Sequence, residues 1–539
     1  MRQLQSFTFV FFILFSCIQT TSGQEGHKVK HKEEKNTAHS SHKMRSTDPF
    51  EQGLEMLHHM MYEQAEDLFH KALEADPEKA IAHWGIAMTV LRPLWAPPNK
   101  KDFEKGLAAI EKAYSTGNPT EREREDIKVL YDFYITAKEE GYRQGLALWK
   151  NSLENLHKKY PDDIETASLY ALSLIATAPQ DDKTYSQQRK AGALMEEFHK
   201  KDPQHPGPFH YSIHAYDNPV LAEKGIRFAN AYDQLAPDVP HALHMPSHIF
   251  VRVGNWDGTI SWNLRSAESA LRQPAGNKTS MHHAHALDYL IYAYLNQGRN
   301  QKALEVLNEL IVIDNYQPTF AAAYAIAAGP ARYFLEGRKW EEAGNFAFTK
   351  SEGFPWENFP QYEAITWWSR GLGAAMSNKP TIAREAVDKL RSLEKQTRDN
   401  KEDYWALLVN TQLKTVEAWI LHSEGKYEKA IALMSDAADQ EDSVEKHPVT
   451  PGHVLPGREL LGDMLLLNDK PQEAMAAYQA ALKISPNRFN SLFGAGKAAQ
   501  LAGKNEIAKD FFRQLLETAI AEESERTELK VAAAFLQKD

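Results

Sequence analysis

Hydrophobic residues recur every three or four positions along most of the chain, which is the spacing of one face of an α-helix. The strict alternation of hydrophobic and polar residues that marks a strand does not persist anywhere. Several helical stretches end at a proline, as at Pro77 and Pro486, because proline cannot continue a helix interior. The pattern therefore predicts an all-α protein.

Within the helical stretches, the same residue types return after 34 positions. Gly462 and Tyr478 are followed by Gly496 and Phe512, and residues 62–77 (YEQAEDLFHKALEADP) show the same order of small, aromatic and proline positions. This period resembles the tetratricopeptide repeat, in which two antiparallel helices, A and B, approach closely at small residues. The resemblance implies a solenoid, a superhelix of stacked helix pairs whose A helices line a concave groove.

The first 23 residues have the features of an export signal. Arg2 precedes an apolar run at residues 7–15 (FTFVFFILF), which is too short to span a membrane as a mature helix. Two interpretations of its processing remain open. The signal is either cleaved before Gln24, or it ends at a lipobox whose Cys17 is lipidated, since the residues before Cys17 (LFS) resemble that motif.

A polar tether is expected between the signal and the repeats. Residues 24–46 contain almost no apolar side chains and are rich in His and Lys, which predicts disorder. The solenoid is expected over residues 47–539. The signal predicts the periplasm, the cell envelope or the extracellular space as the cellular location, and a lipid at Cys17 would attach the protein to the membrane.

Composition and charge exclude several kinds of site and argue against one class of partner. The chain has 539 residues, a formal net charge of −11 and one cysteine. A single cysteine excludes a disulfide framework and any multi-cysteine zinc or iron–sulfur site. The negative charge argues against a nucleic-acid partner. The chain also lacks the short motifs of nucleotide-binding loops, serine hydrolases and zinc proteases, so no catalytic residue is nominated.

Histidines are concentrated in one region, with nine of the 22 between residues 205 and 285. Some of them repeat with the 34-residue period and fall in successive expected A helices, where equivalent positions should lie about 8–10 Å apart. Asp217 follows about one helical turn after the pair His210 and His214. The candidate metal ligands are His210, His214, His244, His248, His282 and Asp217.

Pro246 decides the geometry of one histidine pair. If a single helix runs from Pro240 through Pro246, His244 and His248 share one face, four residues apart. If the helix begins at Pro246 instead, His244 lies outside it and the shared face is lost.

Three interpretations of the histidines remain open. Imidazole pairs near a carboxylate suit a divalent transition metal such as zinc, copper or iron. Alternatively, buried histidines can satisfy hydrogen bonds between helices. In the third interpretation they line a ligand groove with Tyr211, Tyr216 and Arg252 as donors, and Trp84 is a further candidate for a groove contact.

A second polar block lies in a proline-rich segment near the C-terminal repeats. Residues 445–453 (EKHPVTPGH) combine charged side chains with two histidines. Irregular segments in a solenoid are expected to project from one face, often the binding face. The block is therefore interpreted either as the rim of a ligand site or as a rigid connector.

Several longer segments are similar to one family of exported bacterial tetratricopeptide-repeat proteins of uncharacterised function. The resemblance implies an exported helical-repeat protein and assigns no residue a role. The segments that carry it are residues 53–62 (GLEMLHHMMY), 82–88 (AHWGIAM), 93–98 (PLWAPP), 210–217 (HYSIHAYD), 240–256 (PHALHMPSHIFVRVGNW), 285–294 (HALDYLIYAY) and 442–464 (DSVEKHPVTPGHVLPGRELLGDM).

The expected function is therefore an exported scaffold that binds a peptide, a protein or a small ligand in its concave groove. The first alternative is a metal-binding protein or metalloenzyme that uses the histidines. The second alternative is a surface lipoprotein for nutrient capture, which requires lipidated Cys17.

Overall fold

The computed structural model describes residues 44–95, 97–346 and 353–537. The predicted export signal, Cys17 and most of the predicted tether lie outside these ranges. Within them the chain is helical, with two isolated β-bridges (Ala275 to Lys278 and Thr279 to Tyr316) and no strand. The prediction of an all-α helical-repeat fold is confirmed.

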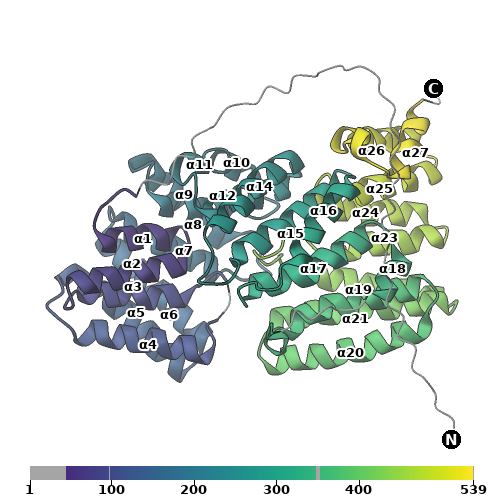
Figure 1. Cartoon of the computed structure of the whole chain (residues 1–539). Helices are drawn as coiled ribbons and strands as arrows, with labels where there is room; N and C mark the ends of the chain where they lie inside the picture. The colour runs from purple at the N-terminus through teal and green to yellow at the C-terminus, as the bar shows by residue number, and fades with distance from the viewer. Residues whose placement is uncertain (1–43, 96, 347–352, 538–539) are drawn as a thin grey trace, which may run out of the picture. The chain divides into compact units, whose positions relative to one another are not determined.

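The helices follow one another along the chain with mostly short connections (Figure 1). The N-terminal helices are α1 (Pro49–His58), α2 (Tyr62–Ala75), α3 (Ala80–Leu91), α4 (Lys100–Ser115), α5 (Glu121–Glu139), α6 (Tyr142–Lys159), α7 (Ile164–Ala176), α8 (Ser186–Lys201), α9 (Pro206–Tyr216), α10 (Ala222–Ala229) and α11 (Tyr232–Leu235). The middle helices are α12 (Pro240–His244), α13 (Pro246–Val253), α14 (Trp256–Arg272), α15 (Met281–Asn296), α16 (Asn300–Val312), α17 (Phe320–Glu336), α18 (Trp340–Asn345), the 3₁₀ turn η1 (Trp356–Asn358) and α19 (Pro360–Met376).

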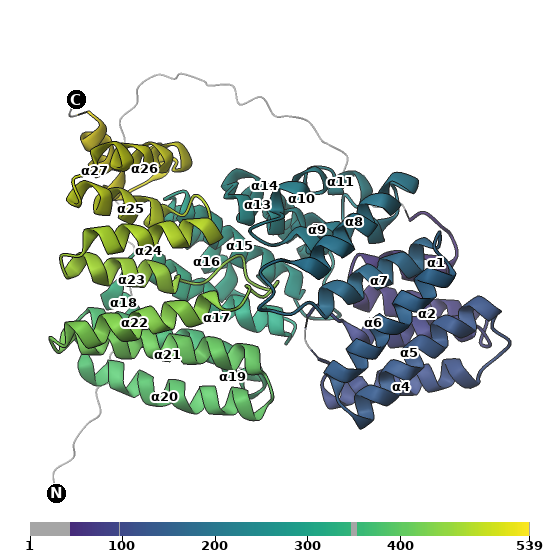
Figure 2. The same ribbon diagram turned by 180° about the vertical axis from the view of Figure 1, so that it is seen from behind.

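The C-terminal helices continue the same arrangement, as the reverse view shows (Figure 2). Most consecutive helices pack against each other, and α15, α17, α19 and α21 (Asp403–Ser423) also contact next-but-one neighbours, which is how successive helix pairs stack. The C-terminal helices are α20 (Pro380–Asp399), α21 (Asp403–Ser423), α22 (Tyr427–Asp442), α23 (Gly457–Leu467), α24 (Pro471–Ile484), α25 (Phe489–Leu501), α26 (Asn505–Thr518), the 3₁₀ turn η2 (Ala521–Glu523) and α27 (Thr527–Leu536).

The repeat signature has a direct packing basis. The ring of Tyr478 on α24 lies against Gly462 on α23 and Gly494 on α25, where an added Cβ would approach the ring to 2.7 and 2.4 Å. Phe69 occupies the same place between Gly53 and Gly85, with approaches of 2.5 and 2.7 Å. A side chain at any of these glycines would displace the aromatic ring, so the small residues set how closely the helices pack.

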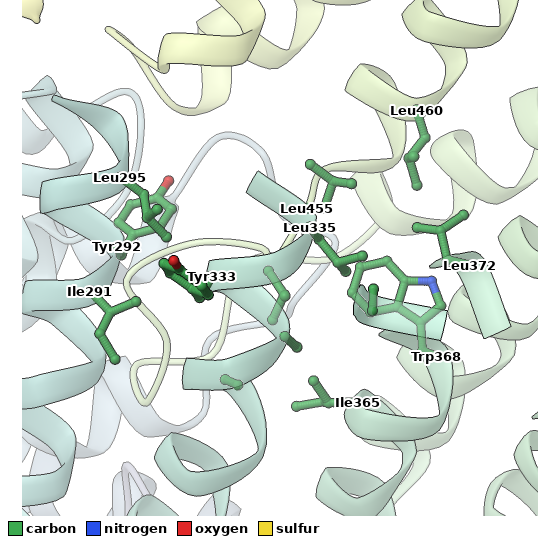
Figure 3. Close-up of a cluster of buried hydrophobic side chains, with 14 of the residues drawn as sticks. Ile291, Tyr292, Leu295, Tyr333, Leu335, Ile365, Trp368, Leu372, Leu455 and Leu460 are labelled. Atoms are coloured by element: carbon green, nitrogen blue, oxygen red, sulfur yellow. The ribbon is translucent and has the colours of Figure 1, made fainter. Parts of the chain in front are cut away.

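The hydrophobic core of the described residues forms two clusters, one with residues from Phe50 to Trp262 and the other with residues from Val251 to Ala532. Figure 3 shows side chains of α15, α17 and α19 in one buried cluster with two residues near the start of α23. Ile291 and Tyr292 anchor α15 in this cluster, and α15 also carries three histidines described below. The core therefore fixes the position and rotation of that helix.

The proline-rich segment between α22 and α23 does not project into solvent. Val449, Thr450 and Leu455 are buried, and the fully buried Arg332 of α17 donates to the Gly452 carbonyl at 3.0 Å and to the His453 carbonyl at 3.1 Å. The expectation of a projecting loop is wrong here, because a buried arginine holds the loop backbone inside the molecule.

Candidate metal centre

Seven buried histidines from α9, α12, α13 and α15 come together in the described part of the chain. None of them is more than 8% exposed, and each ring lies within about 6 Å of at least one other histidine ring of the group. We call this group the histidine cluster. Its members are His210, His214, His241, His244, His248, His282 and His285.

The backbone around Pro246 resolves the open question about the helix. α12 ends at His244 and α13 begins at Pro246, so the helix is interrupted. Met245 between them nevertheless keeps helical angles, with φ −53° and ψ −39°. His244 and His248 therefore still face each other, and their Nε2 atoms lie 3.1 Å apart.

Hydrogen bonds to the other ring nitrogens fix which atoms carry the protons in this pair. The Nδ1 of His244 lies 2.7 Å from Oδ1 of Asn263, whose amide nitrogen donates to the Thr259 carbonyl at 2.7 Å. The Nδ1 of His248 lies 2.9 Å from the carboxylate of Asp217. Both Nδ1 atoms are therefore donors, and in neutral rings both Nε2 atoms carry lone pairs.

Asp217 lies behind His248 and is held by cations. Its carboxylate accepts from Nε of Arg252 at 2.8 Å and from Nζ of Lys446 at 3.0 Å. Burial alone would raise the pKa of Asp217, but Lys446, Arg252 and His248 outweigh burial and hold that pKa well below its usual range. The ionised carboxylate thus orients His248 and is not directed at the facing Nε2 atoms.

Burial keeps the imidazoles neutral. It lowers the pKa of His210 to about 3 and that of His282 to about 4. It also lowers the pKa of His244 well below its usual value, an effect to which His285 and His248 add. Neutral imidazole is the form that binds metals.

His285 completes a group of three around the facing pair. Its ring centroid lies 4.3 Å from that of His244, and its buried Nδ1 has no hydrogen-bond partner among the described residues. One nitrogen from each of His244, His248 and His285 lies within 4.8 Å of the other two. We call these three residues the second triad, because three other histidines that precede them in the chain form a first triad, described next.

A first triad lies beside it and consists of His210, His214 and His241. One nitrogen from each ring again lies within 4.8 Å of the other two. The rings of His214 and His248 connect the triads, with centroids 5.7 Å apart.

The structure thus brings four of the six predicted ligands, His210, His214, His244 and His248, into the two triads. His282 belongs to neither triad and packs on His241 with ring centroids 5.3 Å apart. The sequence-based selection omitted His241 and His285. The signal for His241 was its position three residues before His244 on the same helical face, whereas nothing in the sequence indicates Asn263.

A small cavity adjoins both triads. It offers about 20 Å³ to a water-sized sphere, slightly more than the ~10–15 Å³ that one water needs. Its walls combine histidines of the cluster with mainly apolar residues, one of them beside His282 on α15 and the others from three further regions of the chain. These residues are Trp95, Met281, Phe320, Ala321, Pro448 and Val449.

The polar block of the proline-rich loop closes this region. Besides the contact of Lys446 with Asp217, Nε2 of His447 lies 3.1 Å from the Trp95 carbonyl. Glu445 accepts from the Tyr185 hydroxyl at 2.6 Å and lies 3.6 Å from Arg252. The loop is thus a fixed cover whose charged side chains support the buried Asp217.

The four residues predicted for a ligand groove are all buried. The Tyr211 hydroxyl contacts Nδ1 of His58 at 3.1 Å, the Tyr216 hydroxyl donates to Glu196 at 2.6 Å, and Arg252 pairs with Asp217. Trp84 packs in the N-terminal core. Their role in a groove stays a prediction.

A separate cluster contains His58, Glu165 and His205. The Glu165 carboxylate accepts from Nε2 of His58 at 2.6 Å and from Nε2 of His205 at 2.8 Å. The remaining nitrogens contact the Tyr211 hydroxyl and the Gly207 N–H, the latter at 3.2 Å. Every ring nitrogen of this cluster has a partner within the protein.

Comparison with known families supports the repeat. Residues 458–488 match the tetratricopeptide repeat, and this segment covers most of the pair α23 and α24. The tetratricopeptide assignment is therefore confirmed for this pair. No curated protein matches the chain significantly.

Solved structures show weak similarity over most of the chain. A human IFIT1 dimer with m7Gppp-AAAA is 13% identical with a TM-score of 0.36, covering 86% of this chain and 95% of that one. Yeast Tom70 is 12% identical with a TM-score of 0.29, covering 90% and 94%. The Cut9–Hcn1 hetero-tetramer of the APC/C is 12% identical with a TM-score of 0.28, covering 90% and 95%. Identities and TM-scores this low say nothing about what the present chain binds.

The helices considered for a membrane span are those within residues 44–95, 97–346 and 353–537. None of the helices there is both long and apolar enough to cross a bilayer.

Proposed function

We propose that this helical-repeat protein of the tetratricopeptide type is a metalloprotein in which His244, His248 and His285 bind a transition-metal ion. The observation that carries the proposal is the pair of Nε2 lone pairs that face each other at 3.1 Å. Two nitrogen ligands of a tetrahedral zinc ion with bonds of 2.0–2.1 Å are about 3.3–3.4 Å apart. A cation between the two atoms would replace a repulsion with two coordinate bonds.

A shared proton is the competing explanation for this short contact. It would place a positive charge in a buried site that already faces Lys446 and Arg252. Burial, together with those two cations, lowers the pKa of His248 despite the neighbouring Asp217. The surroundings thus disfavour a bound proton. A metal ion also meets an electrostatic cost there, but it gains bonds to three nitrogens at once.

The ligand set favours zinc or copper. Imidazole suits both ions, whereas carboxylate-rich sites suit magnesium, calcium and manganese. Asp217 supports the site from behind His248, and carboxylate–histidine–metal arrangements of this kind orient the ring and raise its basicity. Asn263 orients His244 in the same way.

The cavity supports an exchangeable ligand at the ion. Three protein ligands leave one position of a tetrahedral ion for water or another small molecule. The apolar walls formed by Trp95, Phe320 and Val449 would restrict this position to small ligands. An ion with such a position can activate water or bind a small substrate, which keeps the metalloenzyme alternative within this proposal.

A titration with zinc and with copper(II) tests the proposal on the untagged full chain after removal of metal by a chelator. We expect binding and a rise in melting temperature, because a ligand at 100 times its Kd stabilises the folded state by about 2.7 kcal/mol. The variant His244→Asn/His248→Asn should show a clearly smaller rise than the wild-type chain. Absence of binding in the wild-type chain would overturn the proposal whether or not the variant folds.

The chain supplies a matched control on α15. His283 lies two residues before His285 but contacts Tyr316 at 3.1 Å and Glu309 at 2.9 Å, away from the cluster. His285→Asn should weaken metal binding, whereas His283→Asn should leave it unchanged. Equal loss in both variants would show that damage to the helix, and not loss of a ligand, causes the effect.

The other expectations stay predictions. Stacked helix pairs present surfaces that suit peptide or protein partners in general, and we retain such a partner as a second proposed property of this chain. Export and lipid attachment at Cys17 rest on the N-terminal sequence alone.

A further inference from the structure

The first triad repeats the unusual feature of the second. Nδ1 of His210 lies 2.6 Å from the His58 carbonyl, so this atom is the donor and Nε2 carries the lone pair. That Nε2 atom and Nε2 of His214 are buried without a hydrogen-bond partner in the described chain, and so are both ring nitrogens of His241. A backbone carbonyl is one of the usual partners that orient a metal-binding histidine.

Leaving such atoms unpaired is costly. Each buried polar group without a partner costs about 1–3 kcal/mol. One water could donate to two lone pairs at most, because it has two hydrogens. A cation can accept a lone pair from His210, His214 and His241 together, so it satisfies this arrangement more completely than a water does.

The two triads share the small cavity. His214 and His241 of the first triad and His248 and His285 of the second all line it. The rings of His241 and His244 are 6.2 Å apart, and those of His214 and His248 are 5.7 Å apart. Ions in two-metal sites are commonly about 3.5–4 Å apart and share a small ligand.

We propose that His210, His214 and His241 bind a second transition-metal ion, so that the histidine cluster is a two-metal centre with nitrogen ligands from both triads. This inference rests on the proposed function of the second triad. The cavity between the triads is the place for a small ligand that contacts both ions. Its chemical class is water, hydroxide or a similarly small molecule.

Counting ions per chain tests the second site. Four histidines of the tether, His27, His31, His39 and His42, could add weak sites, so all four are replaced by Gln in every sample. After equilibrium dialysis against zinc or copper(II), elemental analysis should give two equivalents in this background. His210→Asn/His241→Asn and His248→Asn/His285→Asn should each retain one equivalent.

The outcomes separate the two proposals. No ion in the background chain would overturn both of them. One ion that is lost with His248→Asn/His285→Asn and retained with His210→Asn/His241→Asn would overturn the second site only. If the triad variants fail to fold, the stoichiometry of the background chain still decides between one ion and two.

Copper(II) provides an independent readout in the background chain. Two neighbouring copper(II) ions should couple and give a weakened or broadened paramagnetic resonance signal for the amount of copper bound. A full-intensity spectrum of isolated ions at two equivalents would contradict a shared centre.

Discussion

Two groups of buried histidines in this protein differ in how their nitrogens are used. In the His58–Glu165–His205 cluster, one carboxylate joins two imidazoles, and the other nitrogens contact Tyr211 and Gly207. In the histidine cluster, two Nε2 lone pairs face each other and several nitrogens have no partner among the described residues. Both groups contain suitable ligand atoms within 4.8 Å of one another. Unsatisfied nitrogens, rather than the number of histidines, are therefore the basis on which we propose a metal site in the histidine cluster and none in the other group.

The largest effects on stability and metal affinity are expected when the carboxylate charge behind His248 is removed. Asp217→Asn leaves the buried Arg252 and Lys446 without their carboxylate, and breaking a buried ion pair in this way costs about 3–5 kcal/mol. Metal affinity should also fall about 10–100-fold, since His248 loses its orienting partner. Denaturant unfolding and zinc titration measure the two effects. Wild-type behaviour in both would contradict the role assigned to Asp217.

Lowering the pH should have the next largest effect, because it should reduce the contribution of the histidine cluster to stability but not that of Glu165. A histidine whose pKa is about 4 when folded and about 6.5 when unfolded binds its proton preferentially in the unfolded state, so stability is lost as pH falls below 6.5. His282 alone should lower the free energy of unfolding by about 2 kcal/mol when the pH falls from 7 to 5. Burial opposes ionisation of Glu165, but His58 and His205 outweigh it and lower the pKa of this carboxyl well below its usual range, so its contribution persists in this window.

The free energy of unfolding of the metal-free chain at pH 7 and pH 5 checks this expectation. His282→Gln should reduce the difference between the two pH values by about 2 kcal/mol. An undiminished difference would show that His282 does not contribute to the loss of stability.

A smaller effect should follow from the partner of His244. Asn263→Ala removes the acceptor that fixes the His244 tautomer. Metal affinity should therefore fall about tenfold, which is the lower end of the ~10–100-fold loss expected when a residue that orients a metal ligand is removed. Isothermal titration with zinc measures the change. An affinity equal to that of the wild-type chain would mean that the tautomer of His244 is set by other contacts.

The smallest effect on metal binding is expected in the fully partnered cluster. Glu165→Gln weakens the contacts with His58 and His205, and should lower stability while leaving the number of bound ions unchanged. Elemental analysis and thermal unfolding measure these two properties. Loss of an ion in this variant would remove the distinction between the clusters.

Local patterns explain what the sequence could predict of the fold. The 34-residue period placed Gly462 and Tyr478 in one repeat because close helix packing needs a small residue opposite an aromatic ring, and the structure shows that contact. The same period selected His214 and His248, whose rings do meet. These features depend on neighbouring helices, whose spacing the repeat fixes.

Long-range contacts explain what could not be predicted. Lys446 reaches Asp217 across 229 residues, and the burial of the proline-rich loop depends on Arg332. Met245 keeps helical angles through a break that Pro246 makes, which neither interpretation of the sequence anticipated. Protonation states follow from such contacts, so the sequence could indicate the histidines but not their unsatisfied nitrogens.

The most direct test of the central claim is an X-ray absorption spectrum of the zinc-loaded full chain with the four tether histidines replaced by Gln. We predict nitrogen neighbours at about 2.0–2.1 Å, with the outer-shell scattering of several imidazoles. Zinc without imidazole scattering, or a chain that retains no zinc, would contradict the account.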